Sequence, residues 1–198
     1  MLTIIGLGNP IPEYSKTRHN IGEHIISTIV NSEGIDMVSK KLFDALIGKG
    51  DLSGTPVTFV LPQTYMNEPG KTIHKLFGKT SPDAEYKDLI VIHDDIDMPI
   101  GAVKMTYDRG SAGHKGLDSI DNTLKTTKYY RIKIGIIPTD EEGLMRKPNH
   151  DKMPNFVTGT FTDAEWKALQ PTIKKVIETL HIFTKDGPVK AMEFANTK

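Results

Sequence analysis

A continuous apolar run in the middle of the chain, Asp88 to His93 (D-L-I-V-I-H), constrains the fold more than any other feature. A strand that lacks polar alternation needs cover on both faces, which is typical of the parallel sheets in α/β proteins. Segments with strand patterns and segments with helix patterns alternate on either side of this run. We therefore predict a three-layer α/β fold in a single domain over residues 1–198, with a twisted mixed, mostly parallel sheet and helices on both faces.

The surrounding segments have the short lengths expected of such a domain. Apolar patterning predicts further strands at Met1–Gly6, Val57–Leu61, Ala102–Tyr107 and Tyr130–Ile136. Helical spacing predicts a helix from His19–Asn20 to just before Gly34, one carrying Ile73, Leu76 and Phe77, one carrying Leu117, Ile120 and Leu124, one after the capping box Thr162-Asp163-Ala164-Glu165, and one after Gly187-Pro188. Pro171 predicts a bend or a division in the fourth of these helices.

Composition excludes several classes of function. The chain has no cysteine, which rules out disulfides, thiolate catalysis and cysteine-ligated zinc. It has no apolar run of membrane-spanning length and no leader pattern, so we expect a cytoplasmic protein without a membrane partner. Lys+Arg and Asp+Glu balance at 25 each, so a nucleic-acid partner would need a local basic patch.

The first strand ends in a glycine turn, Gly6-Leu7-Gly8-Asn9-Pro10, that invites a dinucleotide-binding interpretation. The G-x-G-x-x-G pattern fails, because Ile11 stands where the third glycine belongs and prolines interrupt the turn. A small-molecule enzyme with a nucleotide cofactor is therefore disfavoured. The turn instead offers the amide of Asn9 at the carboxyl end of a strand, with the imidazole of His19 following closely.

Polar side chains follow three of the predicted strands. In open α/β sheets ligands bind beyond the carboxyl ends of the strands, which places Asn9, Tyr65 to Asn67 and His93 to Asp95 on one rim within reach of His19. A carboxylate bonded to one imidazole nitrogen fixes the tautomer and leaves the other nitrogen to accept a proton. Amides can orient a carbonyl and stabilise charge on its oxygen. With no activated nucleophile apparent, this set favours hydrolysis by a base-activated water.

Two other features allow alternative interpretations. The run His93-Asp94-Asp95-Ile96-Asp97 could indicate a metal site, although acidic clusters after buried strands are more often caps and turns. The loop Gly110 to Gly113 could offer backbone N–H groups to a phosphate, but glycine loops are mostly just turns. We favour a carboxylate that orients a base over a metal ligand.

Six ordered blocks of sequence carry a resemblance that covers nearly the whole chain. They are Gly6–Pro10 with Tyr14 and Thr17–Gly22, Thr64–Asn67, His93–Gly101, Gly113–Leu117, Arg131–Ile136 and Asn155–Gly159. In order and spacing they resemble the motifs of the bacterial-type peptidyl-tRNA hydrolases. The resemblance implies cleavage of the ester that joins a peptide to the 3′ ribose of tRNA, which recycles tRNA from aborted translation.

The resemblance also implies roles for particular residues. His19 would activate water, and Asp94 would hold it in its basic form. Asn9 and Asn67 would bind the peptide end, with Asn9 distinguishing blocked from free aminoacyl-tRNA. Tyr14, Tyr65 and Met66 would line the binding site of the acceptor end of peptidyl-tRNA, where aromatic faces suit stacking. No metal and no cofactor is implied.

The chain departs from the family pattern in two places, at Lys115 and at Glu68-Pro69-Gly70, which replaces the family's usual small polar residue and its neighbours after Asn67. The family has Asn in Gly-Gly-His-Asn-Gly, whereas this chain has Lys115 there, and Lys can only donate hydrogen bonds. We predict phosphate contacts for Lys115 and for Lys104, Arg109 and Lys133. The main alternative is an RNA-binding paralogue with weak or no hydrolase activity, which Lys115 supports and the intact His19–Asp94 pair opposes. We expect a monomer.

Overall fold

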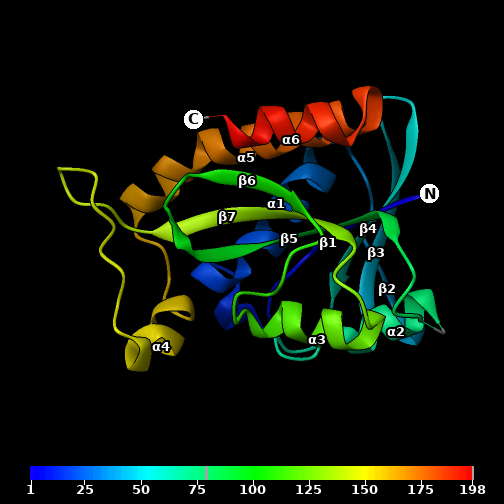
Figure 1. Cartoon of the computed structure of the whole chain (residues 1–198), viewed down its shortest axis with the longest axis horizontal. Helices are drawn as coiled ribbons and strands as arrows, with labels where there is room; N and C mark the ends of the chain where they lie inside the picture. The colour runs from blue at the N-terminus through cyan, green and yellow to red at the C-terminus, as the bar shows by residue number, and fades with distance from the viewer. Residues whose placement is uncertain (79, 198) are drawn as a thin grey trace.

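A computed structural model describes residues 1–78 and 80–197 of the chain (Figure 1). Its centre is a seven-stranded sheet with the strand order β2-β3-β4-β1-β5-β7-β6. The strands are β1 (Leu2–Gly6), β2 (Val38–Lys40), β3 (Ala45–Leu52), β4 (Thr55–Pro62), β5 (Tyr86–Pro99), β6 (Val103–Tyr107) and β7 (Tyr129–Ile137).

The sheet is parallel at its centre and antiparallel towards both edges. Strand β1 lies parallel between β4 and β5, with Ile4 opposite both Phe59 and Ile90, and β5 pairs in parallel with β7. The pairs β2–β3, β3–β4 and β6–β7 are antiparallel. The predicted mixed sheet is therefore confirmed, and its four parallel strands all end at the same edge.

Helices cover both faces of the sheet, as predicted. The helices are α1 (Ile21–Ser32), α2 (Gly70–Phe77), α3 (Lys115–Leu124), α4 (Met153–Val157), α5 (Asp163–Asp186) and α6 (Pro188–Asn196), and the 3₁₀ turns are η1 (Pro12–Tyr14), η2 (Arg18–Asn20), η3 (Lys41–Phe43) and η4 (His150–Lys152). Helices α1, α5 and α6 pack on one face and α2 and α3 on the other, which produces two separate apolar cores (Figure 1). None of the described helices is long and apolar enough to cross a membrane.

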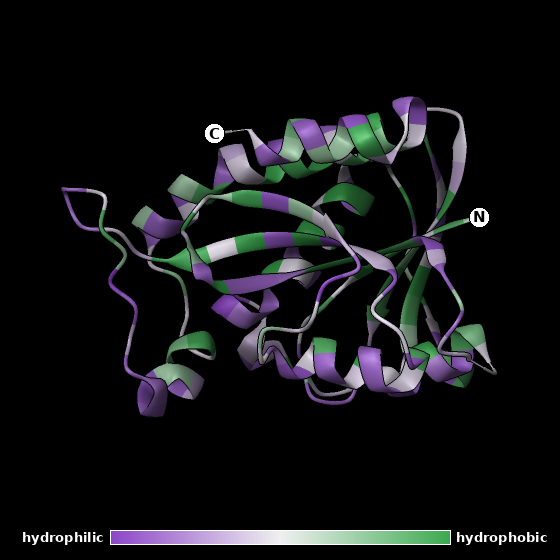
Figure 2. Ribbon diagram, in the orientation of Figure 1, coloured by the Kyte–Doolittle hydropathy of each residue, from purple (hydrophilic) through white to green (hydrophobic). Residues whose placement is uncertain are grey.

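The apolar run that opened the sequence argument lies in β5 and belongs to both cores. Ile92 packs in the core beneath α1 and α5, and Val91 packs in the core beneath α2 and α3. Both side chains are fully buried. The helices show alternating hydrophilic and hydrophobic bands, as expected where only one side of each helix faces the sheet (Figure 2).

Three local predictions were wrong or incomplete. Strand β5 does not end at His93 but continues to Pro99, because β7 keeps pairing with it past an irregularity between Asp95 and Pro99. Strands β2 and β3 were not predicted. Helix α5 is a single element that contains the exposed Pro171, so the division considered from the sequence does not occur.

The last helix protects one edge of the sheet. Strand β6 is the outermost strand on its side, and Asn196 of α6 lies beside it. The Met105 N–H donates to Asn196 Oδ1 at 2.9 Å, and Asn196 Nδ2 donates to the Met105 carbonyl at 3.1 Å. The amide side chain thus occupies the backbone donor and acceptor that a neighbouring strand would use.

Candidate active site

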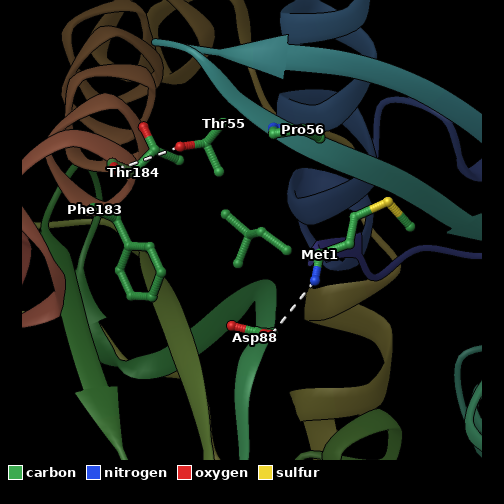
Figure 3. Close-up of a pocket in the computed structure, with 7 residues that line it drawn as sticks. Met1, Thr55, Pro56, Asp88, Phe183 and Thr184 are labelled. Atoms are coloured by element: carbon green, nitrogen blue, oxygen red, sulfur yellow. Dashed lines mark hydrogen bonds and ion pairs between the residues drawn. The ribbon is translucent and has the colours of Figure 1, made fainter.

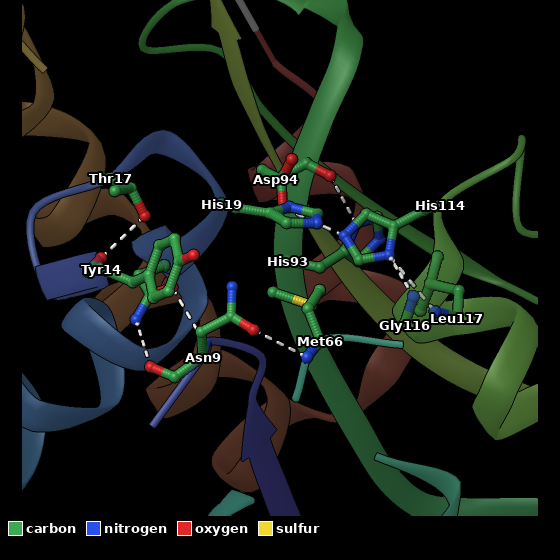
Figure 4. Close-up of polar contacts among 11 residues, drawn as sticks. Asn9, Tyr14, Thr17, His19, Met66, His93, Asp94, His114, Gly116 and Leu117 are labelled. Atoms are coloured by element: carbon green, nitrogen blue, oxygen red, sulfur yellow. Dashed lines mark hydrogen bonds and ion pairs between the residues drawn. The ribbon is translucent and has the colours of Figure 1, made fainter. Parts of the chain in front are cut away.

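His19 and Asp94 lie in contact at the edge where the parallel strands end. Turn η2 presents His19 immediately before α1, and its Nδ1 lies 2.7 Å from Asp94 Oδ1 (Figure 4). The Asp94 side chain is 1% exposed and the His19 ring 14% exposed. An ionised carboxylate only accepts, so His19 Nδ1 is the donor and its Nε2 keeps a free lone pair. The structure therefore gives this imidazole the arrangement of a general base.

The close packing of α1 on the sheet makes this contact possible. A Cβ atom at Gly22 would collide with the carbonyl oxygen of Ile92 and with the backbone of Leu7. Glycine at this position lets the first turn of α1 lie directly on β5. The 3₁₀ turn before it is thereby brought close enough for His19 to reach Asp94.

Asp94 receives a second imidazole on the same oxygen, and the rings of His19 and His114 lie side by side with their centres 5.0 Å apart. His114 Nε2 lies 3.0 Å from the same Oδ1, and His114 Nδ1 accepts the N–H groups of Gly116 and Leu117 at 3.1 and 3.3 Å (Figure 4). Burial acts to raise the pKa of Asp94, but His19 and then His114 beside it outweigh that effect and hold the pKa well below its usual value. The carboxylate at this site is consequently ionised.

A third histidine lies behind this pair. His93 Nδ1 donates to the backbone carbonyl of Asp94 at 2.6 Å, and its ring packs edge-on against His114 with the ring centres 5.0 Å apart. Burial, with a smaller effect from His114, lowers the pKa of His93 well below its usual value. A neutral His93 therefore fills the space behind the two polar rings.

Asn9 presents a fixed amide to the same space. Its Oδ1 accepts the Met66 N–H at 2.8 Å. Its backbone N–H donates to Asn20 Oδ1 at 2.9 Å, and its carbonyl accepts Asn20 Nδ2 at 2.9 Å. With the oxygen occupied, the amide nitrogen is left as a donor, and it lies on the side of Asn9 that faces His19 (Figure 4). Asn9 can therefore donate to a ligand in front of the base.

An ion pair anchors the turn that carries His19. Arg18 Nη2 donates to both carboxylate oxygens of Glu165 at 2.9 Å, and its guanidinium lies 4.5 Å above the ring centre of Phe156. Burial acts to raise the pKa of Glu165, but hydrogen bonds from Thr162 and from Arg18 lower it overall. Both charged side chains are nearly buried, at 11% and 13% exposure. The turn is thus attached to the beginning of α5.

The predicted substrate-binding residues differ in their surroundings. Tyr65 is 54% exposed, whereas Met66 is 6% exposed and supports Asn9 through its N–H. Asn67 is exposed and forms no side-chain hydrogen bond with any residue that the structure describes. Tyr14 is half-buried in η1. The aromatic residues thus leave faces open to a ligand on the rim that holds Asn9 and His19.

The predicted phosphate-binding residues do not form one uniform group. Lys104 and Lys133 are opposite one another on β6 and β7, but Lys133 Nζ lies 2.6 Å from Asp95 and is already paired. Lys104, Arg109 and Lys115 are exposed. Lys115 begins α3 directly after His114. The three exposed cations are the better placed to meet phosphate.

His19, Asp94 and His114 have a spacing that could suit a metal ion, since their ligand atoms lie within 4.8 Å of one another. The hydrogen bonds of His114 oppose this use. Metal-binding histidines normally donate an N–H from the other ring nitrogen, whereas His114 Nδ1 accepts two N–H groups. A metal on Nε2 would require a fully deprotonated ring or the loss of both bonds. The three side chains are better suited to hydrogen-bonding one another than to binding a cation.

The acidic run after His93 also has other partners. Asp95 pairs with Lys133, and Asp97 pairs with Lys147. Together with the contacts of Asp94, these pairs leave the run without a common cation-binding point among the described residues.

A hollow of about 620 Å³ lies at the opposite end of the strands from this cluster, at the amino end of β1 (Figure 3). Its lining includes Phe183 and the ion pair between the Met1 amine and Asp88, 3.6 Å apart. It contains none of the predicted site residues. The hollow is therefore separate from the cluster of His19, Asp94 and His114.

Two contributors to the site were missed by the sequence reasoning. His114 was recognised only as part of a motif, because nothing in the sequence shows that a helix start will meet the end of β5. Arg18 and Glu165 were likewise not connected, since they are 147 positions apart. The capping box around Glu165 was visible, but a capping glutamate does not reveal a second partner.

Comparison with known proteins identifies consistent relatives. The sequence model of a family described as "Peptidyl-tRNA hydrolase" matches residues 3–198. A peptidyl-tRNA hydrolase of Citrifermentans bemidjiense is 37% identical and covers 98% of this chain and 97% of its own length. One of Thermodesulfovibrio yellowstonii is 34% identical and covers 99% of both chains. The crystal structure of the peptidyl-tRNA hydrolase from Acinetobacter baumannii superposes with a TM-score of 0.85 at 26% identity, covering 100% of this chain and 95% of the other.

Proposed function

Since this chain belongs to the peptidyl-tRNA hydrolase family, we propose that it hydrolyses peptidyl-tRNA with His19 as the general base and Asp94 as the group that orients it. The reaction splits the ester bond between the peptide and the tRNA, which frees the tRNA for reuse. The observation that carries the assignment of roles is the 2.7 Å contact between His19 Nδ1 and Asp94 Oδ1. The chain is therefore an ester hydrolase whose base is a single oriented imidazole.

The chemical step follows from the free nitrogen of His19. Nε2 accepts a proton from a water molecule, and the resulting hydroxide attacks the ester carbonyl carbon. The imidazolium that forms is stabilised by the ionised Asp94, and it can return its proton to the departing ribose oxygen. General base catalysis of this kind typically contributes about 10²- to 10⁴-fold in rate.

The fixed amide of Asn9 provides a physical basis for substrate choice. Its oxygen is held by the Met66 N–H, so only its nitrogen faces a ligand, and that nitrogen only donates. A peptide carbonyl accepts such a bond, whereas the ammonium group of a free aminoacyl ester also only donates. Asn9 therefore favours esters whose amino group is acylated, and Asn67 supplies a second amide to the peptide.

The remaining predicted residues fit the tRNA side of the substrate. Tyr14 and Tyr65 offer faces on which the bases at the acceptor end can stack. Lys104, Arg109 and Lys115 are exposed and can neutralise phosphates of the tRNA. The proposed reaction uses water and protein side chains and needs no cofactor. We place the reaction in the cytoplasm and assign it to a monomer.

A single-turnover assay on peptidyl-tRNA with the variant His19→Ala tests this proposal. We expect the rate to fall by at least about 10²-fold while binding of peptidyl-tRNA is largely retained. The intact pair and the family membership favour this function over an RNA-binding paralogue. Near-normal turnover by a folded His19→Ala protein would refute the assignment of the base.

A further inference from the structure

Two neighbouring imidazoles share one oxygen of Asp94, and we propose that His114 is the positioning residue that fixes this carboxylate for His19. The proposal rests on the function proposed above, since it concerns the orientation of the same base. Asp94 Oδ1 accepts from His19 at 2.7 Å and from His114 at 3.0 Å (Figure 4). Both ring nitrogens of His114 are already bonded, one to Asp94 and one to the start of α3, so His114 acts on His19 through Asp94.

The start of α3 determines which nitrogen of His114 carries the proton. His114 is the N-cap of this helix, and its Nδ1 accepts the N–H groups of Gly116 and Leu117. A proton on Nδ1 would face two backbone hydrogens, so the neutral ring carries its proton on Nε2. The ring is 9% exposed, and water competes little for either nitrogen. His114 is therefore a permanent donor towards Asp94.

Two donors on one oxygen restrict the carboxylate more than one donor would. The terminal torsion of an aspartate is broad and roughly two-fold, so a single hydrogen bond leaves it room to rotate. Rotation of Asp94 would here break both imidazole contacts at once. His93 supports this arrangement indirectly, because it donates to the backbone carbonyl of Asp94 and packs edge-on against the His114 ring. The carboxylate thus keeps the oxygen that His19 uses in one place.

The variant His114→Asn separates this role from helix capping. Asparagine is among the best N-cap residues, so α3 should keep its start, but its side chain is too short to reach Asp94 as well. We expect kcat to fall about 10- to 100-fold with KM nearly unchanged, since misplacement of a reacting group by about 1 Å can cost about 10²-fold. His181→Asn is the matched control, because His181 lies in α5 and bonds Ser53 away from the cluster. It should retain wild-type kcat.

A second substitution tests whether His114 acts through Asp94. In an Asp94→Asn background, His114→Asn should add less than about 2-fold to the loss, because the oriented oxygen is already gone. Losses that multiply would show that His114 acts independently, and would overturn the proposal. Wild-type kcat in a folded His114→Asn variant would overturn it as well.

A measurement on the unmodified protein guards against a variant that fails to fold. Long-range proton–nitrogen correlation spectra of the imidazoles should show His114 with a protonated Nε2 and an unprotonated Nδ1 at neutral pH. A protonated Nδ1 would overturn the proposal without any mutation. If His19→Ala is inactive while His114→Asn is normal, only this inference fails. If His19→Ala is active, the proposed function itself fails.

Discussion

Replacing Asn9 by aspartate should change which esters the enzyme accepts. The two side chains have the same shape, and the oxygen that accepts the Met66 N–H is retained, so the fold should be preserved. The donor that faces the substrate becomes an acceptor with negative charge. A peptide carbonyl then loses a hydrogen bond and meets an oxygen, whereas an α-ammonium group gains a partner.

The expected magnitude follows from the single bond that is exchanged. Leaving a buried polar group unpaired costs about 1–3 kcal/mol, which corresponds to about 5- to 150-fold in kcat/KM for an N-acetylated aminoacyl-tRNA. The same change should raise the relative kcat/KM for the free aminoacyl-tRNA. Both substrates can be followed by release of tRNA, with Asn67→Asp as a second amide change for comparison. An unchanged ratio of the two kcat/KM values would refute the idea that Asn9 reads the amino group.

Four further predictions concern other contacts. Asp94→Asn should lower the single-turnover rate by at least about 10²-fold, because an amide can donate to His19 Nδ1 and hold His19 in the wrong tautomer. A wild-type rate would show that Asp94 does not orient His19. Arg18→Met should lower the free energy of unfolding by about 1–3 kcal/mol in urea titrations, since Glu165 would lose its charged partner while keeping the Thr162 N–H; a change below about 0.5 kcal/mol would show that the pair is solvated. The folded-state pKa of Glu165 lies below its ordinary 4.5, so its stabilising effect is present above about pH 5 and is lost as the pH falls through 4.5 and below; Glu165→Gln should therefore flatten the acid limb of the stability curve, and an identical limb would contradict this. Lys115→Ala should raise KM and reduce the log–log salt slope of tRNA binding by about one; an unaltered slope would contradict the phosphate contact.

The sequence contained enough to predict the sheet and the edge of it at which His19 and Asp94 lie. The run Asp88–His93 indicates a strand covered on both faces, and the sequence pattern places the residues after it on the same rim as His19. Both predictions depend on local patterns and on the rule that parallel strands end together. The pairing of His19 with Asp94 needed, in addition, the resemblance to a family.

The rest depends on contacts that no local pattern encodes. The end of β5 was misplaced because polar residues after His93 resemble a turn, while pairing with β7 keeps them extended. Lys133 was expected to be free for phosphate, but Asp95 lies beside it across neighbouring strands. The position of His114 against Asp94 arises only when α3 packs on the sheet. Contacts between a helix and the sheet, or between neighbouring strands, are seen only in the structure.

The amide of Asn196 against β6 has a consequence for how this molecule behaves in a crowded solution. An outer strand with free backbone groups is a template on which another chain can pair and from which fibrils can grow. Here one side chain from the last helix occupies the Met105 N–H and carbonyl, and the charged Lys104 beside them is exposed. The last turn of α6 therefore protects this edge of the sheet against self-association.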